Sequence, residues 1–242
     1  MTLVICKTPE EAAQKAAEVL IKQLSAKPAS VLGLPTGGTP VGMYAALAKA
    51  VREKRVDFSK VTTFNLDEYC GLPVSHPESY FTFMDRNFYT PCGLAASQHN
   101  IPNGLVADPD AEALAYDAKI RAAGGIDLQV LGIGHNGHIG FNEPGTPANS
   151  RTHAETLTLK TRQANARFFA SIDEVPKRAI TMGLGTILEA REILLIANGA
   201  DKAEIIAAAL RGPVTPDVPA SFLQNHPRLT VIVDAAASSK CS

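Results

Sequence analysis

One short stretch of this chain combines side chains that can move protons with residues that prevent regular structure. Leu131–Gly145 reads LGIGHNGHIGFNEPG and contains His138, Glu143 and Asn136. An imidazole held by a carboxylate can accept and release a proton near neutral pH. A histidine that served only to bond its own loop would not need so many glycines around it. We therefore expect His138 to act as a proton shuttle, supported by Glu143 and Asn136.

Two other sites are compatible with parts of this stretch. Residues 132–137 read GIGHNG, which satisfies the G-x-G-x-x-G pattern of dinucleotide-binding loops, but that pattern requires a helix directly after it. Gly140 and Pro144 leave no room for such a helix. His135 and His138 have a spacing that a metal site could use, yet they lie on a glycine-rich loop without a clear third ligand. We therefore expect neither a metal nor a cofactor.

A second candidate is an acidic pair in Asn65–Tyr69, which reads NLDEY. An apolar strand is expected over 61–66, and neighbouring residues of a strand point to opposite sides. Asp67 can then face a cleft while Glu68 faces solvent or a salt bridge. A carboxylate with an ordinary pKa of about 3.9 is ionised at neutral pH and can serve as a general base. We predict this role for Asp67, and the alternative is that it only caps the following turn.

A third candidate is the segment 34–40, which reads LPTGGTP. Gly37 and Gly38 allow the backbone to approach a ligand closely. Thr39 is expected to cap the next helix, with Pro40 in its first turn, so that free amides and the helix dipole point at the loop. These features suit a phosphate group, and the alternative is a plain tight turn. No Gly-Lys-Ser/Thr follows, which disfavours a nucleoside triphosphatase.

Two cations are expected to complete this anion site. Lys202 follows a predicted strand and lies in the first turn of the next helix, where the helix dipole disfavours a cation unless an anion binds there. Arg167 belongs to an insertion expected over 151–169 and could reach over the cleft. Either residue alone would more often be a solvated surface charge.

Four of these sequence patches follow predicted strands; they are 35–40, 65–69, 132–145 and 198–202. Short apolar runs alternate with amphipathic stretches, and 90–109 is expected to be a loose segment. The order predicts one α/β domain over 1–242, an open, mainly parallel (Rossmann-like) sheet with helices on both faces. Ligands bind beyond the carboxyl ends of such strands. Within this domain 151–169 is expected to be an insertion and 144–170 a small lid. The predicted strands are 3–6, 30–34, 61–66, 126–131, 178–182, 192–197 and 229–233, with helices including 40–55, 78–88 and 110–122.

The composition narrows the class of protein. The chain has 242 residues, of which 45% are apolar, and a formal net charge of -1 without long runs of one sign. This charge distribution argues against a protein that binds nucleic acid or a membrane surface. No run of about 18 apolar residues predicts a membrane span, and the N-terminus lacks a signal-peptide pattern. The 4 cysteines form no C-x-x-C pair, so we expect a cytoplasmic protein without a disulfide framework.

The same segments closely resemble the glucosamine-6-phosphate deaminase family, an aldose–ketose isomerase family that also releases ammonia. The resemblance implies that glucosamine 6-phosphate and water become fructose 6-phosphate and ammonia. It implies that Asp67 moves a proton between C2 and C1 of the open-chain sugar, and that His138 handles ring opening with Glu143 and Asn136. Many relatives have Asp where this chain has Asn136. The residues that would hold the phosphate are Gly37, Gly38, Thr39, Arg167 and Lys202; the matching segments are 34–40, 65–69, 76–80, 132–144, 150–152 and 165–169.

Two rival functions remain open. The 6-phosphogluconolactonases share the fold and a similar glycine–histidine loop, but the continuation Asn142–Gly145 and the NLDEY segment favour the deaminase. A non-catalytic sugar-phosphate sensor on this fold would normally carry a DNA-binding segment and would not need a base and a proton shuttle.

The resemblance also implies a short type without activation by an amino sugar phosphate. Larger relatives build a second phosphate site from basic residues after a Ser-Arg-Thr motif and from a longer C-terminal segment. Here Ser150–Thr156 reads SRTHAET, and only eight residues follow Asp234. His153 is mostly neutral at pH 7 and Glu155 is anionic. We therefore expect a monomer or small homo-oligomer that binds only its amino sugar phosphate substrate.

Overall fold

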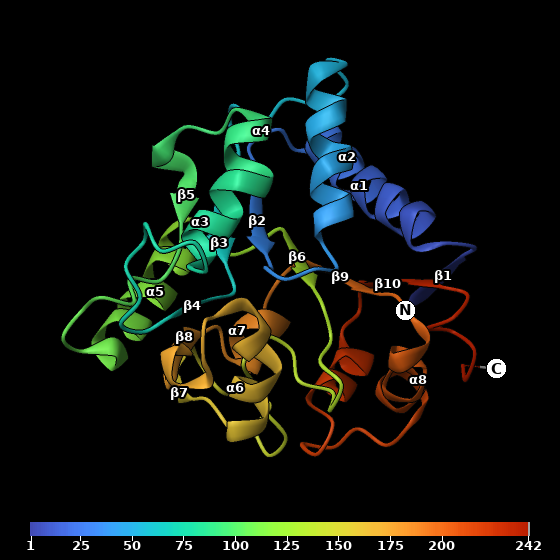
Figure 1. The fold of residues 1–242 in the computed structure, drawn as a ribbon. Coiled ribbons are helices and arrows are strands. Elements are labelled where there is room, and N and C mark those ends of the chain that lie inside the picture. Colours follow the sequence, from blue (N-terminus) through green and yellow to red (C-terminus); the bar gives the residue numbers. More distant parts are fainter. Residues whose placement is uncertain (242) are drawn as a thin grey trace.

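The computed structural model describes residues 1–241, and at position 164 only the backbone. Its centre is a parallel seven-stranded sheet in the order β1-β10-β9-β6-β2-β3-β5 (Figure 1). Every neighbouring pair in this sheet is parallel, which confirms the predicted open α/β fold. The strands are β1 (Thr2–Cys6), β2 (Val31–Leu34), β3 (Thr62–Asn65), β5 (His99–Asn100), β6 (Leu128–Leu131), β9 (Glu192–Ala197) and β10 (Leu229–Asp234).

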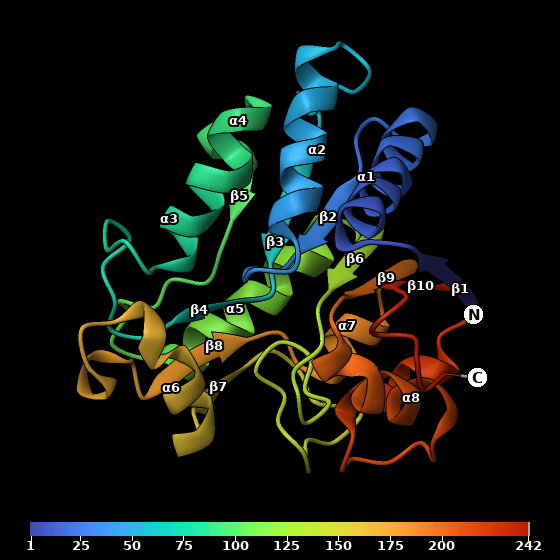
Figure 2. The same cartoon turned by 45° about the vertical axis from the view of Figure 1, so that its right-hand side comes forward.

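Helices cover both faces of this sheet, as the sequence predicted (Figure 2). Successive residues of a strand serve opposite faces, and β9 shows this directly. Leu194 and Ile196 pack with the layer of α1 (Pro9–Ala26) and α2 (Val41–Arg52). Ile193 and Leu195 pack with the opposite layer of helices. That layer consists of α5 (Pro109–Ala122), α7 (Leu184–Leu188) and α8 (Ala203–Arg211). Among residues 1–241, no helix has both the length and the apolar character needed to cross a membrane.

A second, smaller sheet corrects the prediction of one sheet. It has the order β4-β8-β7, is antiparallel, and consists of β4 (Asp67–Tyr69), β8 (Arg178–Thr181) and β7 (His153–Thr156). The run 178–182 is a strand as predicted, but it belongs here and not to the parallel sheet. The chain leaves the main sheet directly after β3, and the Met182 amide donates to the Leu66 carbonyl where the two sheets meet. Strand patterns alone do not specify the partner of a strand.

The segment around residue 90 is also more regular than predicted. α3 (Tyr80–Met84), a π-helical turn (Asp85–Tyr89) and α4 (Thr90–Cys92) follow one another without a break. Gly93 then ends the run with a φ of 72°, a left-handed conformation that suits glycine. β5 pairs with β3 at the edge of the main sheet, inside the segment that was expected to be loose. The proline and glycine content concealed these short elements.

The remaining elements are short. α6 (Leu159–Asn165) follows β7, and Thr158 caps it by accepting a hydrogen bond from the Thr161 amide. The 3₁₀ turns are Ala96–Gln98, Ala166–Phe168, Ile172–Glu174, Ala200–Lys202 and Pro219–Asn225.

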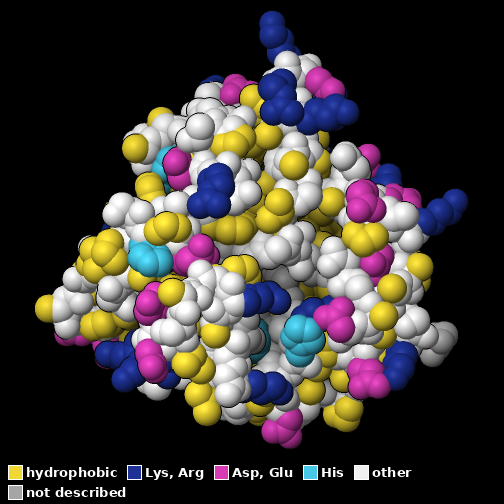
Figure 3. All heavy atoms as spheres, in the orientation of Figure 1, with side chains coloured by type: hydrophobic (Ala, Val, Ile, Leu, Met, Phe, Trp, Pro, Cys, Tyr) yellow, Lys and Arg dark blue, Asp and Glu magenta, His cyan; other side chains and the backbone are white. Residues whose placement is uncertain are grey.

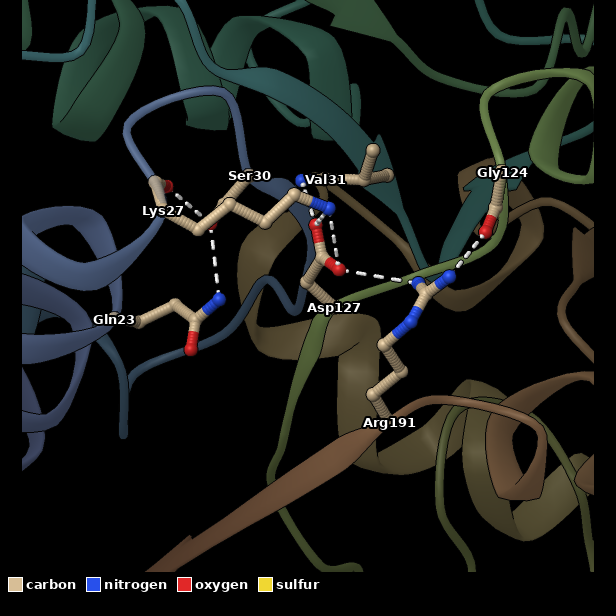
Figure 4. Close-up of polar contacts among 7 residues, drawn as sticks. All are labelled: Gln23, Lys27, Ser30, Val31, Gly124, Asp127 and Arg191. Carbon is tan, nitrogen blue, oxygen red and sulfur yellow. Dashed lines mark hydrogen bonds and ion pairs between the residues drawn. The ribbon is translucent and has the colours of Figure 1, made fainter.

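A buried carboxylate anchors the amino end of the parallel sheet (Figure 4). Asp127 immediately precedes β6 and is only 3% exposed. Its oxygens accept hydrogen bonds from the Lys27 Nζ (2.7 and 2.8 Å), the Val31 amide (2.8 Å) and the Arg191 Nη1 (3.1 Å). The cluster joins the end of α1 to the starts of β2 and β9. Since the candidate site lies at the opposite end of the strands, this cluster is structural.

Candidate active site

The four sequence patches that we singled out meet at one edge of the sheet. They follow β2, β3, β6 and β9, and these strands are neighbours in the order β9-β6-β2-β3. Because the strands are parallel, their carboxyl ends lie along the same edge, which is where open α/β sheets bind ligands. In the view of Figure 3, histidine, lysine and arginine side chains gather around a hollow near the middle of the molecular surface.

The segment between β6 and β7 contains no helix, which removes the dinucleotide interpretation of 132–137. Its glycines instead permit close packing on the candidate histidine. A methyl group at Gly134 would lie 2.2 Å from the His138 ring, so only glycine fits there. The Gly134 amide also donates to the His138 carbonyl over 2.9 Å. The loop therefore positions the imidazole through its own backbone.

Three side chains of this loop form one polar group. The Asn136 Nδ2 donates to the Glu143 Oε2 over 2.6 Å, and the Asn136 Oδ1 accepts from the His138 amide over 3.2 Å. The Glu143 Oε1 lies 3.8 Å from the His138 Nδ1. The structure thus brings the three predicted residues together, with Asn136 between the backbone of the histidine and the carboxylate.

The surroundings of His138 favour its neutral form. Burial lowers the pKa of this histidine, and the Glu143 carboxylate acts in the opposite direction. Nearby positive charges lower the pKa further; they belong to Lys202, His135 and Lys160. A neutral imidazole can accept a proton, as a shuttle must do first.

Asp67 begins β4 and lies beside the same loop. Its side chain is 6% exposed, and within residues 1–241 no group donates a hydrogen bond to its carboxylate. Burial raises the pKa of Asp67 to about 8, and the charge of Glu68 acts in the same direction. A methyl group at Gly140 would lie 3.6 Å from the Asp67 Oδ2, which shows how closely the loop approaches it. A base with a pKa near the working pH is efficient.

The neighbouring Glu68 does not face solvent or a salt bridge, contrary to our expectation. It is 3% exposed and accepts hydrogen bonds from the amides of Tyr69 (2.8 Å), Tyr80 (3.0 Å) and Phe81 (2.9 Å). Burial raises the pKa of this carboxyl, and the three amides oppose the rise. Glu68 therefore ties β4 to the first turn of α3. No pattern along the chain indicated this contact, because the two segments are twelve residues apart.

A cavity of about 290 Å³ connects the glycine-rich turn after β2 with the segment after α6. Gly37, Gly38 and Arg167 all line it, as expected for a phosphate site. Gly37 has a φ of 99°, which favours glycine. Thr39 does not line this cavity and does not cap α2, whose first residue follows Pro40 without a side-chain cap. The prediction of a Thr39 cap is therefore wrong, although the start of α2 does follow this turn.

Lys202 follows β9 as predicted, but it ends a 3₁₀ turn and immediately precedes α8 instead of lying in its first turn. It is not part of the cavity lining, but its charge interacts with Arg167 of the lining and with His138 of the glycine-rich loop. Burial lowers its pKa, Asp201 raises it, and the charge of Arg167 lowers it. Its own charge in turn lowers the pKa of His138. Lys202 therefore links the cationic side of the cavity to the histidine loop.

Aromatic residues form another part of the cavity wall, and we had not assigned them a role. Tyr69, Tyr80 and Phe169 line it, and the Tyr69 ring packs on the other two rings. The Tyr69 hydroxyl accepts a hydrogen bond from the Asn165 Nδ2 over 2.9 Å. All four lie in segments that carried the family resemblance, so their motifs were visible although their contacts were not.

The donor set does not suit a metal ion. Within residues 1–241, no three histidine, cysteine, aspartate or glutamate side chains come together in a way that could hold one. His135, one of the two candidate ligands, instead pairs through its Nε2 with the Asp201 Oδ2 over 2.8 Å.

A buried carboxyl group and a histidine–carboxylate pair beside a cation-lined glycine turn, at the carboxyl edge of a parallel sheet, are typical of enzymes that transfer protons on a small phosphorylated substrate. Comparison with known proteins agrees with this class. The chain belongs to the family described as glucosamine-6-phosphate isomerases/6-phosphogluconolactonase, which matches residues 7–232.

Curated relatives match this chain over almost its whole length. A glucosamine-6-phosphate deaminase of Thermoanaerobacter pseudethanolicus is 50% identical over 239 residues, which are 99% of this chain and 94% of the relative. A glucosamine-6-phosphate deaminase of Clostridioides difficile is 49% identical over 240 residues, which are 99% of this chain and 96% of the relative.

Solved structures give the same result. A monomeric glucosamine-6-phosphate deaminase superposes with a TM-score of 0.96 at 47% identity, covering 99% of this chain and 100% of that one. A 6-phosphogluconolactonase of Trypanosoma brucei superposes with a TM-score of 0.79 at 18% identity, covering 100% of this chain and 98% of that one. The second likeness shows the fold alone.

Proposed function

We propose that this protein is an enzyme that converts glucosamine 6-phosphate and water to fructose 6-phosphate and ammonia. The observation that carries the proposal is the meeting of Asp67 and the His138–Glu143 pair beside the Gly37–Gly38 turn. Relatives that are about 50% identical over the full chain and are named as deaminases support it. The 6-phosphogluconolactonase alternative is supported only at the level of the fold.

Phosphate binding is the first task in this reaction. We assign it to the turn at Gly37 and Gly38, with Arg167 and Lys202 as cationic partners. The amides at the start of α2 and the helix dipole favour an anion at this turn. The phosphate would then fix the sugar relative to the acid–base residues.

Ring opening is the second task. The hydroxyl group on C1 loses its proton while the ring oxygen gains one, which produces the free aldehyde. His138 suits this exchange because its imidazole can both accept and donate a proton near neutral pH. We assign Glu143 and Asn136 to hold it.

Isomerisation and deamination complete the reaction. Asp67 in its ionised form removes the proton from C2 and returns it to C1, while the C1 oxygen gains a proton and the amino group on C2 loses one. The amino aldehyde thereby becomes an imine at C2 with a hydroxyl group on C1. Water adds to that imine, the C–N bond breaks, and ammonia leaves with the C2 ketone of fructose 6-phosphate. The reaction thus consumes one water molecule and needs no redox partner.

We also propose a lid within 144–170, as the sequence analysis predicted. Asn165, Arg167 and Phe168 from its second half line the cavity opposite Gly37 and Gly38. Its first half is anchored, because Arg151 and Thr152 both donate to the buried Asp117 carboxylate. Pairing of β7 with β8 also holds the residues up to Thr156, which favours movement of the part of the segment that follows β7.

Two further proposals concern the oligomeric state of the protein and its location in the cell. We propose a monomer or small homo-oligomer, in keeping with the monomeric relative. A cytoplasmic location is supported by the four free cysteines, which suit a reducing compartment. Light scattering of the purified protein measures the assembly directly.

An assay of purified protein with glucosamine 6-phosphate tests the proposed reaction. We expect ammonia and fructose 6-phosphate in equal amounts. In parallel, 6-phosphogluconolactone should not be hydrolysed above its spontaneous rate. Lactone hydrolysis without ammonia release would favour the lactonase alternative, and ligand binding without either product would favour a sensor.

A further inference from the structure

The histidine–glutamate pair is not hydrogen-bonded in this structure. The His138 Nδ1 and the Glu143 Oε1 are 3.8 Å apart, which exceeds the length of a hydrogen bond. The Nδ1 atom is buried and has no partner within residues 1–241. A buried polar atom without a partner costs free energy, so something must hold the carboxylate away from it.

Two donors hold the Glu143 carboxylate. Asn136 from the same loop donates to Oε2, and Thr161 from α6 donates through its Oγ1 to Oε1 over 2.5 Å. Oε1 is the oxygen nearest to His138. Thr161 is only 9% exposed, and the Thr158 hydroxyl donates to its Oγ1 over 3.0 Å, which fixes the direction of the Thr161 hydroxyl. The carboxylate that should serve the histidine is thus bonded to the proposed lid.

We infer that Thr161 is a positioning residue that holds Glu143 beyond hydrogen-bonding distance of His138 while α6 lies against the histidine loop. When α6 is displaced, the hydroxyl is withdrawn and the carboxylate reaches the imidazole. α6 leads directly to Arg167, which lines the phosphate cavity. The same segment therefore contacts both the phosphate site and the acid–base pair. The inference deepens the proposed function, on which the roles of His138 and Glu143 rest.

The titration of His138 in ligand-free Thr161→Val tests this inference. Valine has the shape of threonine but no hydroxyl, so Glu143 is expected to turn to the His138 Nδ1. A hydrogen bond to an ionised carboxylate stabilises the imidazolium. The pKa of His138, followed by NMR, is expected to rise by about half a unit or more relative to wild type. His138→Gln identifies its signal among the 6 histidines.

Three matched variants separate this effect from a general structural one. Thr161→Ser retains the hydroxyl and should titrate like wild type. Thr146→Val removes a hydrogen bond of 2.7 Å to the Glu143 backbone carbonyl, not to its carboxylate, and should also leave the titration unchanged. In a Glu143→Gln background, Thr161→Val should have no effect. The other charged groups around His138, which are Lys202, His135 and Lys160, are the same in all of these proteins.

An unchanged pKa of His138 in Thr161→Val would overturn the inference, as would a rise that persists in the Glu143→Gln background. If Thr161→Val does not fold, Thr161→Ala makes the same test. The titration needs neither substrate nor turnover. Its failure would leave the proposed deaminase reaction standing, and absence of deaminase activity would leave the titration result standing.

Discussion

At the scale of single residues, the chemistry proposed here depends on a carboxyl group placed where water cannot stabilise its charge. Asp67 is buried next to another acidic residue, and both conditions raise its pKa, to about 8. An ordinary aspartate would be fully ionised at neutral pH but would be a weak base. Asp67 gains basicity from the same burial that makes its ionised form costly to the fold.

Replacement of Asp67 by Asn should therefore have opposite effects on activity and stability. Turnover should fall about 10²–10⁴-fold, because a general base contributes about that much. In wild type, kcat/KM should rise with pH up to about 8, as Asp67 ionises. Near-wild-type turnover of a well-folded Asp67→Asn would remove the residue from this role.

The stability effect of Asp67→Asn should depend on pH. A carboxyl with a folded pKa of about 8 binds a proton on folding at intermediate pH. Its contribution to stability is fully present below its unfolded pKa and is lost as the pH rises through the folded value. Asp67→Asn should thus come closest to wild type in Tm below about pH 4 and exceed it increasingly as the pH rises to 9, by about 2–4 °C for each kcal/mol gained. A lower Tm at pH 9 would contradict this reasoning.

Removal of metal ions is expected to leave activity unchanged. The candidate ligands His135 and His138 make separate contacts, His135 with Asp201 and His138 with its own loop. Exhaustive chelation followed by the ammonia assay checks this expectation. Activity that disappears with the chelator and returns with one divalent ion would establish a metal-dependent enzyme.

At the scale of secondary-structure elements, Glu68 joins the strand that carries Asp67 to the helix that carries Tyr80. Glu68→Gln should retain an acceptor oxygen but remove the charge that contributes to the raised pKa of Asp67. The rise of kcat/KM should therefore occur at lower pH than in wild type. The pH profiles of both proteins check this, with Glu68→Asp as the variant that keeps the charge. An identical profile would show that Glu68 acts only structurally.

The opposite end of the sheet offers a test of stability without an effect on activity. Asp127→Asn removes charge-assisted hydrogen bonds to Lys27 and Arg191, which should cost about 1–3 kcal/mol. Urea unfolding measures the loss. Lys27→Met should cost less, because the Lys27 side chain is 50% exposed and such pairs contribute about 0–1 kcal/mol. A large decrease in kcat for Asp127→Asn would mean that the two ends of the sheet are not independent.

At the scale of the whole molecule, a second groove bears on whether the enzyme is regulated. This groove has a volume of about 560 Å³ and is lined by residues that include Glu143, His153 and Glu155. The His153 side chain already has a partner within the groove, because its Nε2 lies 3.1 Å from the Glu155 Oε2. Arg151, also in the lining, is bonded to Asp117 and Glu189. A phosphate in this groove would meet carboxylates and no free cation among these residues.

We therefore expect hyperbolic kinetics that N-acetylglucosamine 6-phosphate does not change. Allosteric activation requires a second site whose ligand favours one state of the protein, and an acidic groove repels such an anion. Initial rates over a range of glucosamine 6-phosphate, with and without the N-acetyl compound, check this. A sigmoidal curve that becomes hyperbolic on its addition would refute it.

The sequence by itself determined the parallel sheet, the four patches at its carboxyl edge and the glycine loop around His138. These features are local: strands appear as apolar runs, and glycines mark turns wherever they occur. Because parallel strands end at one edge, local signals also placed Asp67 and His138 near each other. The Glu143–Asn136 contact could be expected because it is also local, since the two residues are only seven positions apart in the sequence.

Only the tertiary structure decided which distant segments touch. Strand 178–182 belongs to a second sheet, and Glu68 is buried against the first turn of α3. Thr161 of α6 contacts the Glu143 carboxylate. The structure also leaves Thr39 without the capping role that its position suggested. Such contacts depend on how whole layers pack, and packing joins residues that have no pattern in common along the chain. The environment that sets the pKa of Asp67 is of this kind, because burial is a property of the fold and not of the segment.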